Sequence, residues 1–211
     1  GLTGPDGPTH HGLFDIGYMR VFPNLVLMAP GYAAEVEPML AAALALDHPS
    51  AVRYPKASAL ELNRQPDPIE IGKSEVVREG SDGTIVALGA MLEQALAASD
   101  LLSEEGLDVG VVNARFIKPI DQEMVQRTLA NGRFVVTVEE GARRGGVGSA
   151  FNEAAIDGQL DTRSLRVRAL PDEFIEHGDR NELLDDHGLS PEAIAQTCRE
   201  AAGVESLPSS T

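Results

Sequence analysis

The sequence predicts an α/β protein of two lobes, each built on a mainly parallel sheet. Short apolar runs that end in Gly, Pro or polar residues alternate with longer stretches of helix-forming residues, an order typical of βαβ units. A segment punctuated by Pro and Gly, residues 63–83, separates an opening region from a longer second one. With 43% of its 211 residues hydrophobic, the chain is long enough for one large core or two modest ones.

The opening region predicts a strand, a helix and a second strand. Residues 24–30 are an apolar run ended by Pro and Gly, which is typical of a buried strand. Residues 33–46 have helix-forming composition, and Pro38 must lie near the first turn of that helix. Residues 50–56 favour another short strand. This order predicts that the two strands are parallel.

The second region continues the alternation and predicts a complete α/β unit of roughly five strands, mostly parallel. An apolar stripe at helical spacing supports the first of its helices. Residues 204–211 are expected to be a frayed tail. The strands are expected at residues 84–90, 108–116, 133–140 and 164–171, and the helices at 91–106, 121–132, 145–159 and 190–203.

Charge and composition exclude several classes of protein. The formal net charge is −16, which argues against binding to nucleic acid or to an anionic membrane, since both need basic patches. The chain has no apolar run of about 18 residues and no signal-peptide pattern at its start. Cys198 is the single cysteine, so an internal disulfide is impossible; we expect it to be buried on a helix, in a protein of the reducing cytoplasm.

The opening loop, GPDGPTHHGLFD, is rich in groups that can do chemistry. Asp6, His10, His11 and Asp15 raise the possibility of a metal site, but adjacent histidines in a turn rarely reach one ion and no other element adds ligands at a familiar spacing. A second interpretation makes His10 a proton or hydrogen-bond donor to a substrate oxygen, with Asp6 fixing its tautomer. A third is a histidine that only caps a turn.

A glycine-rich stretch over residues 141–154 precedes a predicted helix, where free backbone N–H groups can hold an anion. The simpler interpretation is that its glycines permit a tight turn and close packing. Arg143 and Arg144 are candidates for a subunit interface. Glu139 and Glu140 are adjacent on a predicted strand, so they should point to opposite faces and form a poor acid/base pair.

The motifs DGPTHHGLFD, NLVLMAP, SAVRYPK, VVNARFIKPID, VTVEEGARRGGVGSAFNE and LPDEFIEHG follow one another along nearly the whole chain. In this order they resemble the 1-deoxy-D-xylulose-5-phosphate synthase family of the transketolase superfamily. The β-type subunits of pyruvate dehydrogenase share the architecture and are the nearest alternative.

The resemblance implies a division of the chain into domains. Residues 1–62 would be the second half of a pyrimidine-binding domain, 63–83 a linker with an extended segment, 84–203 a complete transketolase C-terminal domain, and 204–211 a tail. The family's diphosphate- and magnesium-binding GDG motif and its activating glutamate have no counterpart in these residues. We therefore expect a C-terminal fragment of a longer synthase.

The resemblance also implies an activity for the parent protein. Members are transferases that condense pyruvate with D-glyceraldehyde 3-phosphate to 1-deoxy-D-xylulose 5-phosphate and carbon dioxide, for isoprenoid and thiamine biosynthesis. They use thiamine diphosphate and Mg²⁺ as homodimers in the cytoplasm. We expect this chain alone to bind neither cofactor nor metal and to be inactive.

Three site residues follow from the resemblance. Asp6 and His10 match the Asp and His of the family's DG-x-TH motif, which face substrate oxygens. Lys56 stands where the family's RYPR motif has an arginine on the acceptor phosphate; lysine keeps the charge but lacks the two-pronged fork. Arg53 is expected to be a structural partner, and His11 receives no role.

Two other classes of function remain open. One is a β-type subunit of a two-chain thiamine-diphosphate enzyme, whose partner would supply the diphosphate site. The other is a non-catalytic α/β module that contributes only dimer contacts.

Overall fold

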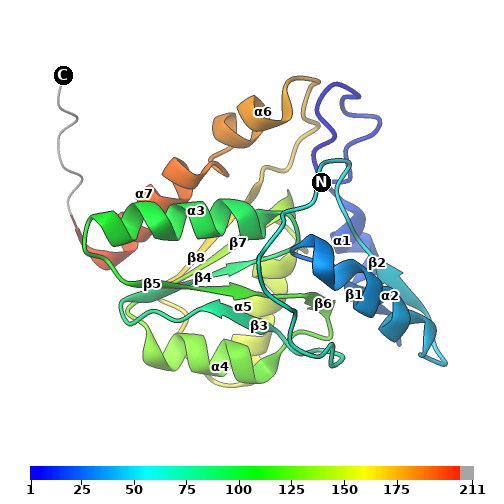
Figure 1. Cartoon of the computed structure of the whole chain (residues 1–211), viewed down its shortest axis with the longest axis horizontal. Helices are drawn as coiled ribbons and strands as arrows, with labels where there is room; N and C mark the ends of the chain where they lie inside the picture. Colours follow the sequence, from blue (N-terminus) through cyan, green and yellow to red (C-terminus); the bar gives the residue numbers. More distant parts are fainter. Residues whose placement is uncertain (205–211) are drawn as a thin grey trace.

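A computed structural model describes residues 1–204 and contains two sheets that lie next to each other (Figure 1). The larger sheet has the strand order β3-β5-β4-β7-β8, and all its pairs are parallel except β3 with β5. This arrangement confirms the predicted α/β class with a five-stranded, mostly parallel sheet. Its strands are β3 (Glu75–Arg78), β4 (Gly83–Ala87), β5 (Val109–Asn113), β7 (Val135–Ala142) and β8 (Leu165–Leu170).

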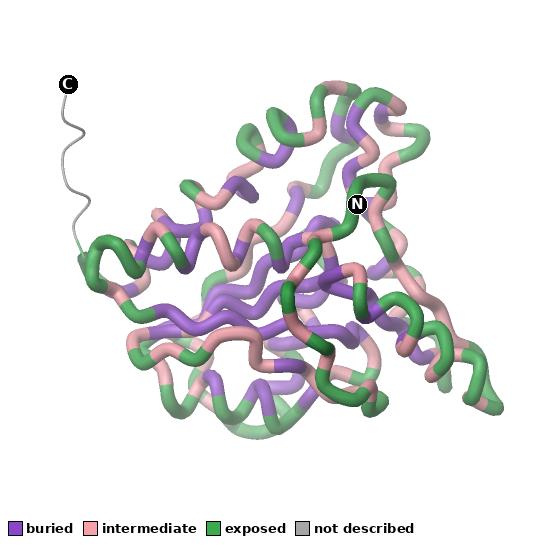
Figure 2. Tube along the Cα trace, viewed as in Figure 1, coloured by how far each residue is buried: buried purple, intermediate pink, exposed green. Residues whose placement is uncertain are grey.

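Helices cover both faces of the larger sheet, which explains why its inner strands β4, β5 and β7 are almost entirely buried. Helices α3 (Met91–Glu104) and α7 (Pro191–Ala202) lie on one face, and α4 (Gln122–Asn131) and α5 (Val147–Asp157) on the other. Ile85 and Val86 of the central strand belong to different core clusters, one on each face. Figure 2 shows the strands as a buried layer between partly exposed helices.

The smaller sheet has the order β2-β1-β6. Strands β1 (Val26–Met28) and β2 (Ser50–Val52) are parallel, as predicted, and are connected through a 3-10 turn η1 (Ala33–Glu35) and helix α2 (Val36–Leu44). Two short helices were not expected from the sequence, α1 (Asp15–Met19) and α6 (Arg180–Asp186). No helix within residues 1–204 has the length and apolar character needed to cross a membrane.

The predicted strand over residues 108–116 is wrong at its end. Strand β5 stops at Asn113, and Arg115 adopts a left-handed conformation with φ 57°. That turn sends the chain across to the smaller sheet, where β6 (Phe116–Lys118) pairs antiparallel with β1. The Asn113 side chain accepts a hydrogen bond from the Arg115 amide at 3.3 Å and supports the turn.

The segment expected as a linker contributes β3, which forms the edge of the larger sheet opposite β8. The extended part of residues 63–83 is therefore a strand of that sheet. The tail expected over residues 204–211 lies, apart from Val204, outside the described residues.

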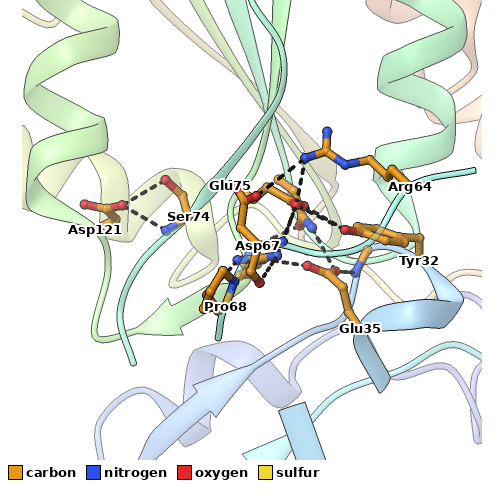
Figure 3. Close-up of polar contacts among 11 residues, drawn as sticks. Tyr32, Glu35, Arg64, Asp67, Pro68, Ser74, Glu75 and Asp121 are labelled. Atoms are coloured by element: carbon orange, nitrogen blue, oxygen red, sulfur yellow. Dashed lines mark hydrogen bonds and ion pairs between the residues drawn. The ribbon is translucent and has the colours of Figure 1, made fainter. Parts of the chain in front are cut away.

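A buried cluster of charges joins the two sheets (Figure 3). The Arg115 side chain is 1% exposed, and its Nε donates to Glu35 Oε1 at 2.5 Å while Nη2 lies 3.2 Å from Glu75 Oε1. Glu35 comes from η1 and Glu75 from β3, so one guanidinium connects three segments that are distant in sequence.

Neutral donors satisfy the remaining oxygens of this cluster. Asn113 Nδ2 donates to Glu35 Oε2 at 2.8 Å, and the Tyr32 hydroxyl lies 3.2 Å from Glu75 Oε2, to which it can donate. Burial and the nearby carboxylates raise the pKa of Tyr32 well above its usual range, so its hydroxyl keeps the proton that it donates. Buried charges are tolerated only when paired and hydrogen-bonded in this way.

Replacing Arg115 by Met should therefore lower the free energy of unfolding by about 3–5 kcal/mol, because two buried carboxylates lose their cation. Urea unfolding of the 211-residue chain measures the change. Arg163→Met is the matched control, since Arg163 forms an exposed pair with Asp161 and such pairs contribute about 0–1 kcal/mol. Equal small losses in both variants would contradict the role given to Arg115.

Candidate functional site

The opening loop is shaped by two glycines in left-handed conformations. Gly4 has φ 73° and Gly7 has φ 72°, values that residues with a Cβ rarely adopt. The Gly7 amide bonds to the Gly4 carbonyl at 3.2 Å, and the His10 and His11 amides bond to the Gly7 carbonyl at 3.0 and 3.1 Å. These turns place Asp6 and His10 on the same short loop.

His11 fixes the loop to its surroundings. Its Nδ1 accepts from the Thr3 amide at 3.0 Å, and its Nε2 lies 3.4 Å from the Glu176 carbonyl oxygen. Because a backbone N–H can only donate, Nδ1 must be unprotonated, and Nε2 is the nitrogen that carries hydrogen in the neutral ring. His11, which received no role from the sequence, is thus a structural contact.

Arg53 is a structural partner, as expected. Its Nε donates to Asp15 Oδ2 at 2.7 Å, and its Nη2 donates to the carbonyl oxygens of Gly12 at 2.8 Å and Glu140 at 2.7 Å. One side chain from the segment after β2 therefore ties the end of the loop to strand β7.

The structure brings Asp6 into contact with Lys56, which lies 50 residues later in the sequence. The Lys56 ammonium contacts the Asp6 carboxylate, and this hydrogen bond lowers the pKa of Asp6 below its usual value. The expected contact from Asp6 to the His10 ring is not formed. The His10 Nδ1 instead lies 2.9 Å from the Thr9 hydroxyl, so a neighbouring residue supplies the partner of the imidazole.

Asp6, His10 and Lys56 lie on an open surface. The Lys56 side chain is 69% exposed and the Asp6 side chain 31%, and His10 is exposed as well. A carboxylate, an imidazole and an ammonium at one surface can bind an anionic substrate and exchange a proton with it. Exclusion of water there would need a second surface opposite the loop.

The four candidate metal ligands of the loop do not converge. His11 is bonded to Thr3, and Asp15 is bonded to Arg53. In the part of the chain that the structure describes, no group of three or more His, Cys, Asp or Glu side chains is arranged to hold a metal ion.

The glycine-rich stretch is occupied by the chain's own carboxylate. Glu139 accepts hydrogen bonds from the amides of Val147 at 2.7 Å and Gly148 at 2.8 Å, at the first turn of α5. A Cβ on Gly146 would lie 2.2 Å from Glu139 Oε2, so glycine is required for this approach. The hypothesis of an external anion at this turn is wrong, because Glu139 fills the position.

Glu139 and Glu140 point to different partners, as their adjacent places on a strand predicted. Glu140 accepts from the Leu2 amide at 2.7 Å and from Arg180 at 2.8 Å. Burial raises the pKa of Glu139 to about 7, against the opposing effect of its two backbone hydrogen bonds. Cys198 is a buried free thiol, as expected, and burial raises its pKa to about 12.

The raised pKa of Glu139 makes stability depend on pH. Between the usual glutamate value of 4.5 and about 7, the folded protein holds a proton that the unfolded chain releases. The stabilisation is therefore complete below pH 4.5 and is lost as the pH rises through 7. We expect the unfolding free energy of the chain, relative to its Glu139→Gln variant, to fall by at most about 3 kcal/mol between pH 5 and 8.

Chemical denaturation at several pH values measures this difference. Glu153→Gln is the control, because Glu153 is an exposed carboxylate paired with Arg20, and its difference from the wild-type chain should show no such fall. A difference for Glu139→Gln that stays constant from pH 5 to 8 would contradict the assignment.

Two family models match the chain. The transketolase C-terminal domain matches residues 72–194, and the transketolase pyrimidine-binding domain matches residues 1–60. In Rhodopirellula baltica, a protein named 1-deoxy-D-xylulose-5-phosphate synthase is 68% identical over 202 residues, which are 96% of this chain and 32% of that protein. The synthase of that name from Gloeobacter violaceus is 47% identical and is matched over 97% of this chain and 33% of its own length. The chain thus spans about a third of the curated relatives it matches.

Solved structures agree with the sequence matches. A protein described as "Split gene transketolase, inactive beta4 tetramer" superposes with a TM-score of 0.83 at 29% identity, over 94% of this chain and 64% of that one. A transketolase mutant from Pichia stipitis superposes with a TM-score of 0.73 over 95% of this chain and 28% of its own; at 19% identity it supports the fold alone. With the C-terminal-domain model covering more than half of its residues, the chain belongs to the transketolase family.

Proposed function

We propose that this chain is the C-terminal part of a 1-deoxy-D-xylulose-5-phosphate synthase. The whole protein would condense pyruvate with D-glyceraldehyde 3-phosphate and release carbon dioxide. The observation that carries the proposal is the 68% identity to a synthase of that name over 96% of the chain.

The contacts of the loop suggest what each side chain does. Lys56 is an exposed ammonium held near the loop by Asp6, and it would exchange this carboxylate for the phosphate of the aldehyde substrate. The exposed His10 would donate or accept a proton at a substrate oxygen, since imidazole titrates near neutral pH. Asp6 positions Lys56 and adds negative charge beside His10.

Thiamine diphosphate supplies an electron sink for such a condensation, but the described residues do not fit its diphosphate and metal. The glycine-rich helix start is filled by Glu139, and no group of carboxylates among residues 1–204 is arranged for Mg²⁺. We propose that both are held by residues of the parent protein outside this chain.

The remaining parts of the proposal follow the family. The parent would be a cytoplasmic homodimer that uses Mg²⁺ and serves isoprenoid and thiamine biosynthesis. The open surface around His10 and Lys56 is in keeping with this, because such a site needs a facing surface from the rest of the protein.

A second candidate is a subunit of a two-chain enzyme of the same family. It is favoured by one observation: the structure with a TM-score of 0.83 is described as a split-gene transketolase, and this chain covers 64% of it. The intact mass of the natural gene product separates the two candidates. A chain about three times as long supports the synthase, whereas a short product that co-purifies with a second subunit supports the two-chain enzyme.

In the full-length protein, Lys56→Gln should raise the KM for D-glyceraldehyde 3-phosphate about tenfold or more, because a charge-assisted hydrogen bond to phosphate is lost. Lys56→Arg should lower that KM, since guanidinium binds phosphate with two parallel hydrogen bonds. The KM for pyruvate should stay unchanged in both. Lys73→Gln, at an exposed lysine paired with Glu123, is the control. Unchanged KM values for the aldehyde in both Lys56 variants would refute the role.

The 211-residue chain by itself should show no synthase activity. Supplied with pyruvate, D-glyceraldehyde 3-phosphate, thiamine diphosphate and Mg²⁺, it should form no 1-deoxy-D-xylulose 5-phosphate, while the full-length protein forms it under the same conditions. Turnover by the short chain alone would overturn the proposal that the diphosphate site lies elsewhere.

A further inference from the structure

Most arginines of this chain are neutralised within the molecule. Of the 17 basic residues, three are lysines, which leaves 14 arginines. Within residues 1–204, ten of these arginines lie within 4.0 Å of a carboxylate oxygen. The four others in that range are Arg127, Arg143, Arg166 and Arg168. In a chain of net charge −16, arginines without a carboxylate partner are unexpected.

Three of these four arginines line one cavity. It has a volume of about 510 Å³ and lies at the β8 edge of the larger sheet, between α5 and α7. Arg143, Arg166 and Arg168 contribute three positive charges to its lining, and Glu200 contributes one negative charge. The volume falls in the usual range for small-molecule sites.

The guanidinium groups are held in place by the protein. Arg143 donates to the Val167 carbonyl oxygen at 2.7 Å, and Arg166 donates to the Leu165 carbonyl oxygen at 3.0 Å. Arg168 Nε donates to the buried Thr197 hydroxyl at 2.5 Å. Each of these bonds uses only part of a five-donor group, so donors remain on side chains that are already fixed.

The hydrogen bonds from Arg143 and Arg166 to backbone carbonyls argue against a peptide that would bind as an additional strand beside β8. Ser164 O accepts from Val135 of β7, and successive strand residues direct their backbone groups to opposite edges. The carbonyls of Leu165 and Val167 therefore point to the outer edge, where the arginines cover them. Strand addition needs those carbonyls uncovered, whereas a small anion needs only the remaining N–H donors.

We propose that this cavity binds a small anion that carries phosphate groups, such as a diphosphate, whose two phosphate groups offer acceptors to more than one arginine. Arginine recognises phosphate through parallel hydrogen bonds. The amide group of Asn152 and the hydroxyl group of Thr162 also line the cavity and can hydrogen-bond to phosphate oxygens or to an attached organic group. The inference stands independently of the reaction proposed above.

Calorimetric titration of the 211-residue chain with inorganic pyrophosphate tests the site. We expect saturable binding, weakened about tenfold in Arg166→Gln and in Arg168→Gln, and strengthened in Glu200→Gln. Arg127→Gln removes the same charge outside the cavity, and Lys73→Gln removes an exposed cation paired with Glu123; both should bind as the wild-type chain does. Because Arg166 is exposed, its variant should retain the fold, which circular dichroism checks.

A second titration with ADP distinguishes two sources of the phosphate group. Equal affinity for ADP and pyrophosphate assigns recognition to the diphosphate alone, and tighter binding of ADP extends the site to an attached organic group. Absence of saturable binding to either compound would overturn the proposal. So would a loss in Arg127→Gln as large as in Arg166→Gln, because the effect would then be one of net charge.

Discussion

The two sheets of this protein are held together by a guanidinium that has no access to water. Arg115 lies between Glu35 and Glu75, one from each side of the junction. Within residues 1–204, Arg64 is the only other cation paired with this cluster, through Glu75. Its side chain is one-third exposed, so Arg115 is the only fully buried cation beside the two carboxylates. Removal of a charge from such a cluster costs far more than the loss of an exposed pair, so the position of η1 relative to β3 depends on this contact.

The left-handed turn at Arg115 follows from the same arrangement. The turn both directs the side chain into the cluster and sends the backbone from β5 to β6. A backbone conformation that costs free energy persists where surrounding contacts fix it. Here the hydrogen bonds of Asn113, to Glu35 and to the Arg115 amide, supply that support.

The opening loop is held mainly by hydrogen bonds between side chains and backbone groups, in contrast to the ion pairs around Arg115. Arg53 and His11 between them bond to the carbonyl oxygens of Gly12, Glu140 and Glu176 and to the Thr3 amide. These contacts fix the path of the loop and leave the side chains of His10 and Lys56 exposed. The loop is therefore built as a fixed support for side chains that face outward.

The elements that the sequence predicted correctly are those with a local signal. Apolar runs identified the four parallel strands of the larger sheet, and the order of β1, α2 and β2 predicted a parallel pair. The short helices α1 and α6 and the strand β6 have only three to seven residues each, too few for a periodic pattern. Their places depend on distant partners, such as β1 for β6.

The candidate site shows the same limit. The family resemblance singled out Asp6, His10 and Lys56 as candidates, but no spacing in the sequence could show that Asp6 contacts Lys56 in preference to His10. The role of Glu139 was also missed, since adjacent glutamates on a strand indicate only opposite directions. A signal was present in retrospect: a glutamate seven residues before a glycine at a helix start can reach back to that helix.

At Arg115 the chain passes from the larger sheet to the smaller one, and this limits how the protein can be divided into exchangeable parts. Strand β6 comes after three strands of the larger sheet in sequence, yet it completes the smaller sheet beside β1. A chimera joined near residue 83 would take β6 from one parent and β1 from the other. Compatible halves must therefore match at an antiparallel strand pair and at a shared ion cluster, so exchange of these two units between relatives is a problem of interface design.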